Sequence, residues 1–380
     1  MTSTATHPLK PFAALPHPRE VIRQFTPNWF AVTMGTGILS LCLHALSDSW
    51  PPLYGLAESI WWLNVVLFLL CTSLYGLRWV LFTQEARRVF AHGSVSMFLG
   101  TIPMGLATLI NGLLLFAVPR WGTGLVPLAE ALWWLDVAMA LACGVAIPYA
   151  MFTRQTHRIE QMTAIWLLPV VAAEVAAVSG GLLVGYLVDA QQQLLVLSLS
   201  YALWAYSVPV ALSIMTILLL RLALHKLPHA NMAASSWLAL GPVATAALGM
   251  LTLGAQAPGV FLANGLPALA SVAQGTGVIA GLLFWGLGFW WLGLAALITL
   301  RYVREGLPFN LGWWGFTFPL GAYALASVRL GESLGLGLFH TLGAGLAGCL
   351  VLLWLTVASR TLRGAWRGEL FVAPCLADDQ

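Results

Sequence analysis

The stretch from Gly312 to Gly331 reads Gly-Trp-Trp-Gly-Phe-Thr-Phe-Pro-Leu-Gly-Ala-Tyr-Ala-Leu-Ala-Ser-Val-Arg-Leu-Gly. It is apolar enough to cross a bilayer, yet it contains glycines, hydroxyl groups and the central Pro319. Proline removes a backbone donor and bends a helix, and in hydrocarbon the freed carbonyl must find a partner or line a wet cavity. The stretch therefore predicts an inner, pore-facing helix in which Phe318, beside Pro319, blocks the pore.

The composition of the whole chain indicates a membrane protein that crosses the bilayer many times. Of its 380 residues, 59% are apolar and 8% are charged, whereas an ordinary soluble protein is about 25% charged. The five cysteines show no spacing typical of a metal site. We expect the lipid bilayer as a partner, and no nucleic acid, metal or cofactor.

Apolar segments divide the chain into ten candidate spans, with flexible tails expected at residues 1–25 and 363–380 around a transmembrane domain at 26–362. The region from Gly265 to Arg301 is too long for one span, so its first residues are expected to form a loop or a short half-helix. The candidate spans are 27–46, 58–82, 95–117, 127–152, 163–187, 194–222, 236–256, 272–301, 311–330 and 334–360.

The basic residues predict the orientation. Of the 17 Lys and Arg residues, 15 flank one side of the spans, and only Arg120 and Arg329 fall on the other side. By the positive-inside rule both termini are cytoplasmic, which requires an even number of spans. The expected location is the plasma membrane, that is, the inner membrane of a bacterium.

Four of the odd-numbered spans can be aligned on a proline. Pro103, Pro169, Pro242 and Pro319 are separated by 66, 73 and 77 residues, which indicates repeated helical hairpins. We therefore expect an all-α fold of ten transmembrane helices, arranged as five hairpins with quasi-fivefold order around a central pore. The four prolines would kink the inner helices that line this pore. The alternative is ordinary packing through small residues, without a pore.

Several segments resemble the tellurite-resistance/dicarboxylate transporter family, which includes TehA-like proteins, malate permeases, sulfite efflux pumps and slow anion channels. The matching segments are Phe-Thr-Pro-Asn-Trp-Phe-Ala-Val-Thr-Met-Gly-Thr-Gly-Ile-Leu-Ser at 25–40, Ile-Pro-Met-Gly-Leu-Ala-Thr-Leu-Ile-Asn at 102–111, Trp-Leu-Leu-Pro at 166–169 with Ser-Gly-Gly at 179–181, and Trp-Trp-Gly-Phe-Thr-Phe-Pro-Leu at 313–320. The resemblance implies ten helices in five hairpins, a homotrimer with one pore per subunit, anion transport, and a phenylalanine on the ninth helix that occludes the pore.

The position of this phenylalanine has three readings. The residues before the aligned prolines are Ile102, Leu168, Gly241 and Phe318, so Phe318 is the only aromatic plug at that level. Phe316 is the alternative gate. In the third reading both rings pack against the outer helices.

Conduction of an anion requires weak, repeated sites, because a fixed lysine would bind the ion too tightly. Hydroxyl, amide and backbone groups of the odd spans are the candidates, and each hydroxyl has the alternative of bonding a carbonyl of its own helix. Arg120 and Arg329 would either concentrate anions at the pore mouth or anchor lipid headgroups. The candidate pathway residues are Thr33, Gly35, Thr36, Thr101, Asn111, Ser179, Thr245 and Thr317.

Glu174 lies in the middle of the fifth span, where an ionised carboxylate on the pore wall would repel anions. It is expected to be protonated, to face a subunit contact, or to couple proton movement to dicarboxylate uptake. Asp136 is expected to pair with a neighbouring helix, and His340 to be a packing residue.

The predicted function is transport of small anions or C4-dicarboxylates such as malate. Sulfite efflux and tellurite-related efflux are alternatives within the same family. A membrane oxidoreductase is the alternative from another class, but no two histidines face each other at a matching depth for haem. HExxH is absent as well, so we do not expect an enzyme.

Overall fold

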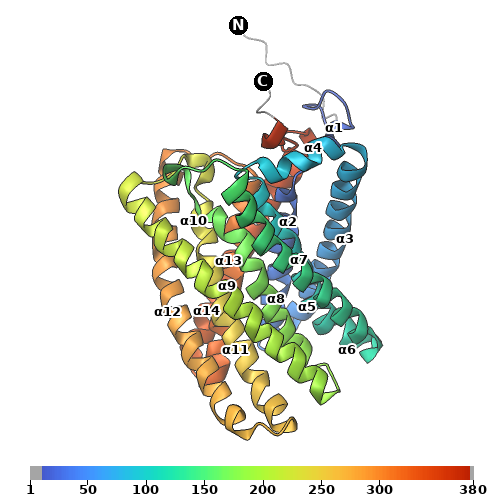
Figure 1. Ribbon diagram of the computed structural model, residues 1–380, viewed down its shortest axis with the longest axis vertical. Coiled ribbons are helices and arrows are strands. Elements are labelled where there is room, and N and C mark those ends of the chain that lie inside the picture. Colours follow the sequence, from blue (N-terminus) through green and yellow to red (C-terminus); the bar gives the residue numbers. More distant parts are fainter. Residues whose placement is uncertain (1–10, 377–380) are drawn as a thin grey trace.

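The computed structural model describes residues 11–376, and this part of the chain is helical, without a strand (Figure 1). Within it, α2 (Phe30–Ala45) has 16 residues and α13 (Thr317–Leu334) has 18. Eight other helical segments are long and apolar enough to cross a membrane. They are Pro52–Leu81 (α3), Ser96–Trp121 (containing α5, Thr101–Gly112), Thr123–Thr153 (containing α7, Val126–Thr153), Ala164–Val184 (containing α8, Leu168–Val184), Ala190–His225 (α9), Ala230–Ala263 (containing α11, Leu240–Ala263), Pro267–Glu305 (α12) and Gly337–Arg367 (α14).

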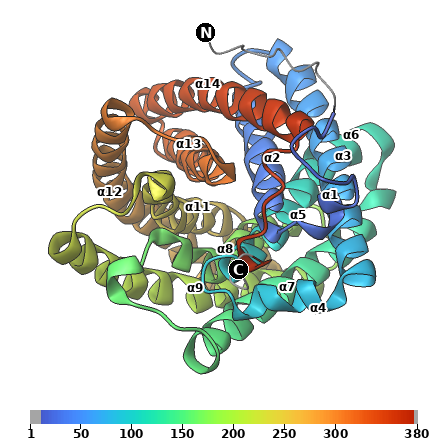
Figure 2. The same ribbon diagram turned by 90° about the horizontal axis from the view of Figure 1, so that it is seen from above.

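Five helices form a closed ring of contacts at the centre of the molecule. Helix α2 contacts α5, α5 contacts α8, α8 contacts α11, α11 contacts α13, and α13 returns to α2. Figure 2 shows this inner ring from above. In α5, α8 and α11 the apolar windows are 78–89% buried within this single chain. The members of the inner ring are therefore helices whose whole circumference is covered by protein.

The other five helices form an outer layer, and each follows an inner helix in the chain. Helices α3, α7, α9, α12 and α14 pack against α2, α5, α8, α11 and α13, respectively. Their apolar windows are only 22–33% buried, and large apolar side chains such as Phe152, Leu283 and Leu352 are exposed. An apolar surface of this kind is the one that hydrocarbon covers.

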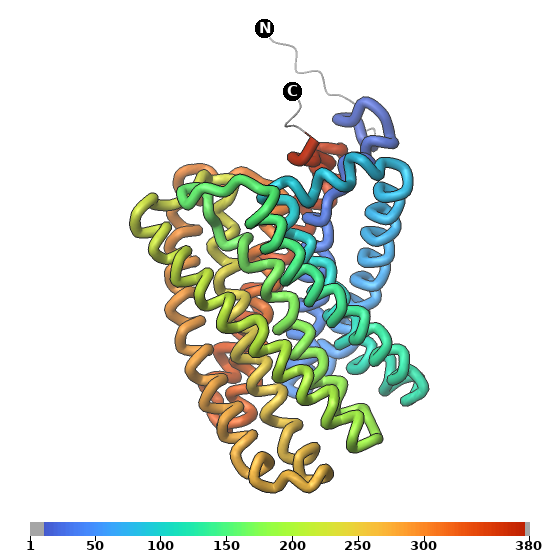
Figure 3. Tube along the Cα trace, viewed as in Figure 1, coloured from blue at the N-terminus to red at the C-terminus, as the bar shows by residue number. Residues whose placement is uncertain are grey.

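Helix α12 corrects one expectation from the sequence. The first residues of the region from Gly265 to Arg301 do not form a loop or a half-helix, because Pro267–Glu305 is one uninterrupted helix of 39 residues (Figure 3). Small residues permit this, since a Cβ on Gly277 would lie 2.6 Å from the carbonyl oxygen of Met250 in α11. Close backbone contact keeps α12 straight along α11 beyond the length that one bilayer crossing needs.

The four aligned prolines also differ from expectation. Pro103, Pro242 and Pro319 are the third residues of α5, α11 and α13, and Pro169 is the second residue of α8. A 3-10 segment precedes α5, α8 and α13, and the short helix α10 (Ser235–Leu238) precedes α11. The prolines therefore mark helix starts, where a missing N–H costs little, and do not bend the middle of a regular helix.

Candidate functional site

A cavity of about 640 Å³ lies at the face that carries both chain ends, here called the terminal face. Each of the five inner helices contributes residues from its start or from the segment before it. We call this cavity the vestibule. Its lining includes Asn28 before α2, Phe98 before α5, Ile165 before α8, Leu238 before α11 and Gly315 before α13.

The electrostatics of the vestibule follow from this arrangement. Five helix N-termini, each preceded by a 3-10 segment or by α10, converge on it, and each carries the positive end of a helix dipole. Among the described residues the lining contains no Lys or Arg, and its ionisable residues are His92 and Glu369. The vestibule can therefore attract an anion through dipoles without holding it on a fixed cation.

The two candidate gate residues have different surroundings. The Phe316 ring packs edge-on against Trp237 and Trp313, with ring centroids 5.6 and 5.7 Å away. Phe318 is also buried, but its ring has no aromatic partner among the described residues. Phe316 is thus held in an aromatic cluster at the terminal face, which leaves Phe318 as the less constrained ring.

Gly241 is the residue of α11 that corresponds to Phe318 of α13, and it has free space beside it. It precedes Pro242 in α11 as Phe318 precedes Pro319 in α13. A Cβ on Gly241 would meet only the Pro319 Cγ, at 3.8 Å, whereas most glycines of the inner ring are in tight contact. The ring therefore has space for a side chain at the level of Phe318.

Most of the predicted pathway hydroxyls are engaged within the protein. Thr33, Thr101 and Thr317 donate to the carbonyl oxygens three residues earlier in the chain, at 2.7–2.8 Å. Ser179 donates to the Val175 carbonyl at 3.3 Å, and Thr36 accepts a hydrogen bond from the Trp354 indole at 3.1 Å. The four donors thus bond a carbonyl three or four residues earlier, whereas Thr36 bonds to the outer helix α14.

Two of these threonines, Thr317 and Thr33, also pack between neighbouring helices of the inner ring. A Cβ on Gly35 would lie 2.2 Å from the Thr317 Oγ1, and a Cβ on Gly105 would lie 2.4 Å from the Thr33 Oγ1. Gly35 is therefore a contact point between α2 and α13 and lacks open space beside it. Thr101 is the one member of the predicted hydroxyl set that also lines the vestibule.

Three predicted residues keep polar atoms that are buried without a hydrogen-bond partner among the described residues. They are the Asn111 Oδ1, the Thr245 Oγ1 and both carboxylate oxygens of Glu174. The Asn28 Oδ1 at the vestibule has the same property, and sequence reasoning missed it. Its position between Pro27 and Trp29, directly before a buried helix, was the available signal.

Helices α8 and α11 are in register along their contact. A Cβ on Gly249 would lie 3.6 Å from the Val178 Cγ2, and a Cβ on Gly181 would lie 3.0 Å from the Thr252 Cγ2. Both pairs have a sequence separation of 71 residues, so the two helices run side by side with matching levels.

Glu174 and Thr245 have the same separation, and they lie one helical turn before Val178 and Gly249. They therefore belong to the same facing stripes of α8 and α11, at one level. Glu174 is fully buried and Thr245 is 2% exposed. Asp136 is a second fully buried carboxyl group without a partner, but it lies on the outer helix α7.

Both predicted mouth arginines are paired with carboxylates. Arg120 forms an ion pair with Glu58 and lies over the Trp121 ring, and Arg329 forms an ion pair with Glu332 at 2.8 Å. Exposed pairs of this kind contribute about 0–1 kcal/mol. The carboxylates also reduce the positive potential that either arginine would offer to an anion.

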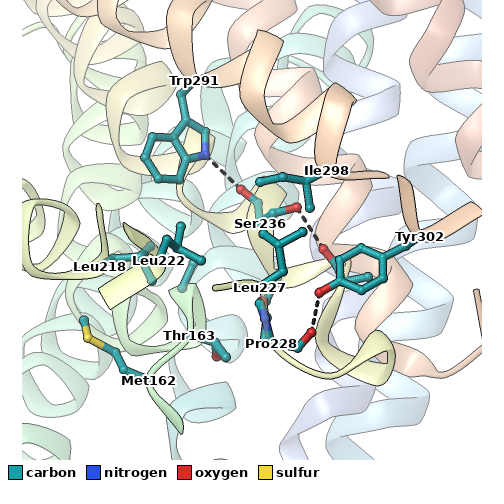
Figure 4. A pocket seen from close by; sticks show the side chains of 13 residues that line it. Met162, Thr163, Leu218, Leu222, Leu227, Pro228, Ser236, Trp291, Ile298 and Tyr302 are labelled. Atoms are coloured by element: carbon teal, nitrogen blue, oxygen red, sulfur yellow. Dashed lines mark hydrogen bonds between the residues drawn. The ribbon is translucent and has the colours of Figure 1, made fainter. Parts of the chain in front are cut away.

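A second cavity, of about 20 Å³, lies between α9, α12 and residues 227–236 (Figure 4). The Tyr302 hydroxyl donates to the Pro228 carbonyl, and the Trp291 indole donates to the Ser236 carbonyl at 2.9 Å. Its size and its mainly apolar lining make it a packing feature that ties α12 to the segment before α11.

The model of the voltage-dependent anion channel family (SLAC1) matches residues 24–362, which include the inner and outer helices described above except the last five residues of α14. The chain belongs to this family. The resemblance to TehA-like proteins found in the sequence is thereby confirmed. Membership also identifies it as a multi-pass membrane protein of an anion-transporting family.

Individual relatives differ in the substrates that their names give. A sulfite efflux pump of Trichophyton rubrum is 36% identical over 352 residues, which cover 92% of this chain and 93% of that protein. A malic acid transport protein of Schizosaccharomyces pombe is 23% identical over 345 residues, or 88% of this chain and 77% of that protein. An uncharacterized transporter of Methanocaldococcus jannaschii is 26% identical over 359 residues, which cover 93% and 96%.

Proposed function

We propose that this chain transports a small oxyanion through the centre of the inner ring, and that the vestibule is the entrance at the cytoplasmic side. The observation that carries this proposal is the convergence of five helix N-termini on one cavity, to whose lining the described residues contribute no Lys or Arg. Dipoles of this kind stabilise an anion while leaving it free to move on. The central path would have quasi-fivefold order, with α2 and α13 crossing the membrane in addition to the eight longer segments.

Sulfite is the substrate that we propose first. Its support is the relative named as a sulfite efflux pump, at 36% identity, compared with 23% for the relative named as a malic acid transporter. A C4-dicarboxylate such as malate is the second candidate. Both are oxyanions, and backbone N–H groups and hydroxyls are donors that suit either one.

Phe318 is the proposed gate. The support is its burial without an aromatic partner, together with the space at Gly241 on α11. A ring that is not locked by other rings can swing aside at low energetic cost, whereas Phe316 would have to leave Trp237 and Trp313.

Glu174 and Thr245 are proposed as the proton-coupling element of the path. An ionised carboxylate buried without a partner is costly, so Glu174 would hold a proton in this conformation and release it only when α8 and α11 separate enough to admit water. The contacting helices α5 and α11 contain no titratable residue. The contacting helices α7 and α9 contain the following titratable groups: Glu130, Asp136, Cys143, Tyr149, Tyr201, Tyr206, Arg221 and His225.

The proposed setting is a plasma membrane, with both termini in the cytoplasm and three copies per assembly. The support for this orientation is the position of 15 of the 17 basic residues on one side of the spans. The trimer rests on the resemblance to the family.

Flux measurements in proteoliposomes test the proposal. Wild-type protein is expected to pass sulfite faster than malate, and both faster than protein-free vesicles. Chloride and nitrate serve as smaller comparison anions. If correctly folded protein passes none of the four anions, anion transport is refuted. If it passes malate faster than sulfite, malate becomes the first substrate candidate and sulfite the second.

A further inference from the structure

The segment after α14 returns across the terminal face to the vestibule. Helix α14 ends at Arg367, and Gly368 follows in the left-handed conformation, with φ of +81°. The chain then runs inward, as the red segment in Figure 2 shows, and ends its described course in a 3-10 turn at Pro374–Leu376. We call residues 368–376 the strap.

The residues of the strap divide between two sides. Leu370, Val372 and Pro374 line the vestibule, and Glu369 lines it as well. Phe371 and Cys375 point away from it and are 7% and 5% exposed. The strap thus presents one edge to the proposed anion path and uses the other edge for anchoring.

The anchors all lie on one side of the vestibule. The Phe371 ring stacks on Trp29, with centroids 4.9 Å apart and an angle of 21°. The Ala373 N–H donates to the Gln24 Oε1 at 2.8 Å, and the Cys375 Sγ lies 3.7 Å from the Arg78 guanidinium. Trp29 belongs to the 3-10 turn that starts α2, so the main anchor of the strap is an inner-ring helix.

The base of the strap is also fixed. The Phe12 and Ala14 N–H groups donate to the carbonyls of Trp366 and Arg367, at 2.7 and 2.9 Å. These bonds hold the end of α14, and the Glu369 N–H adds a bond to the Gly364 carbonyl at 2.9 Å, with Leu370 packed beside Gly364. Release of the Phe371 stack would therefore free residues 371–376, while residues 368–370 stay on α14.

The chemistry of the strap opposes anion entry. Three apolar side chains and the Glu369 carboxylate cover part of a cavity whose other electrostatic feature is a set of helix N-termini. Glu369 has one basic partner, Arg367, at 3.7 Å, and both side chains are about half exposed. The strap thus places apolar bulk and a partly compensated negative charge where the proposed substrate would enter.

We propose that the strap is an intramolecular closure of the vestibule, which restricts anion passage while Phe371 is stacked on Trp29. This proposal rests on the proposed function, because the closed cavity is the proposed entrance. In this proposal the strap itself covers the edge of the vestibule. Its stacking contact with Trp29, directly before α2, connects it to the inner ring.

The test compares sulfite flux of full-length protein with that of Phe371→Ala and of a chain ending at Arg367. Both variants are expected to raise flux about three- to tenfold. Phe152→Ala on outer helix α7 is the matched control, because it removes the same ring at a position that is 81% exposed and does not line the vestibule; its flux should stay within about twofold of wild type. A synthetic peptide of residues 368–380, added at the cytoplasmic face, should reduce the flux of the shortened chain again.

Cys375 provides a readout that does not depend on transport. Its thiol is buried in the strap anchor, so a maleimide should modify it several times faster in Phe371→Ala than in wild type, with the sites resolved by mass spectrometry. Faster modification with unchanged flux would overturn the closure while leaving the anchor intact. Unchanged modification and unchanged flux would overturn both. If no variant and no wild-type protein passes any anion, the proposed function fails, and the closure fails with it.

Discussion

The inner ring and the outer layer are built from equally apolar helices, but they use glycine differently. Mean hydropathy is 2.0 for the window of inner α8 and 2.0 for that of outer α14, yet 89% of the first window and 22% of the second are buried within the chain. A Cβ on Gly100, at the start of an inner helix, would lie 2.2 Å from a backbone carbonyl oxygen, whereas Gly286 on α12 has open space. Mean hydropathy therefore does not distinguish a ring helix from an outer helix, whereas the share of the helix that other parts of the chain cover does.

The largest change in stability is expected when a side chain is added to a glycine that has no free space around it. Gly100→Val should destabilise the protein by about 3 kcal/mol or prevent folding, because the new side chain meets the Leu168 carbonyl, which cannot move without shifting α8. Gly286→Val is the matched control and should change stability by less than about 1 kcal/mol. Thermal unfolding in detergent measures both, and equal shifts for the two variants would contradict the division into ring and layer.

The next effect concerns a phenylalanine in each region. Phe318→Ala should raise sulfite flux roughly tenfold, which corresponds to about 1.4 kcal/mol of removed barrier. Phe289→Ala on α12 is the control, because that ring is 60% exposed on the outer layer. Flux of Phe316→Ala that exceeds the flux of Phe318→Ala would move the gate to the other ring.

Glu174 on inner helix α8 and Asp136 on outer helix α7 provide a further comparison of ring and layer, because both carboxyl groups are buried. Glu174→Gln should retain anion flux but lose the severalfold stimulation that we expect from an inward pH gradient, because the amide cannot carry a proton. Asp136→Asn on outer α7 should keep that stimulation. The substrate speciation is the same for all three proteins at a given pH, so the difference between variants isolates the carboxyl group. Identical gradient dependence of wild type and Glu174→Gln would exclude coupling through Glu174.

The smallest effect is expected at the outer mouth. Arg329→Gln should lower flux by less than about twofold in low salt, and the difference should vanish in high salt, because Arg329 is exposed and already paired with Glu332. Measuring flux over a range of ionic strength checks this. A loss of tenfold or more that persists in high salt would show that Arg329 contacts the anion directly.

The sequence alone determined the membrane class and the family. Composition and the spacing of Pro103, Pro169, Pro242 and Pro319 are properties of the chain itself, and they need no neighbour to be read. They located the start of each later inner helix, although the prolines begin helices and do not bend their interiors. The start of α12 was predicted wrongly, because the region from Gly265 to Arg301 is longer than one bilayer crossing needs, and only the contact with α11 shows that Pro267–Glu305 is one helix.

Only the tertiary structure decided which polar groups are engaged. The direction of a side chain depends on the rotation of its helix, and packing against neighbours sets that rotation. Thr33 and Thr317 therefore pack against glycines of the neighbouring inner helices. Phe316 packs against two tryptophans, and Glu174 and Thr245 lie at one level of α8 and α11. The strap belongs to the same class of feature, because Phe371 and Trp29 lie more than 340 residues apart and their stacking exists only once the ring has closed.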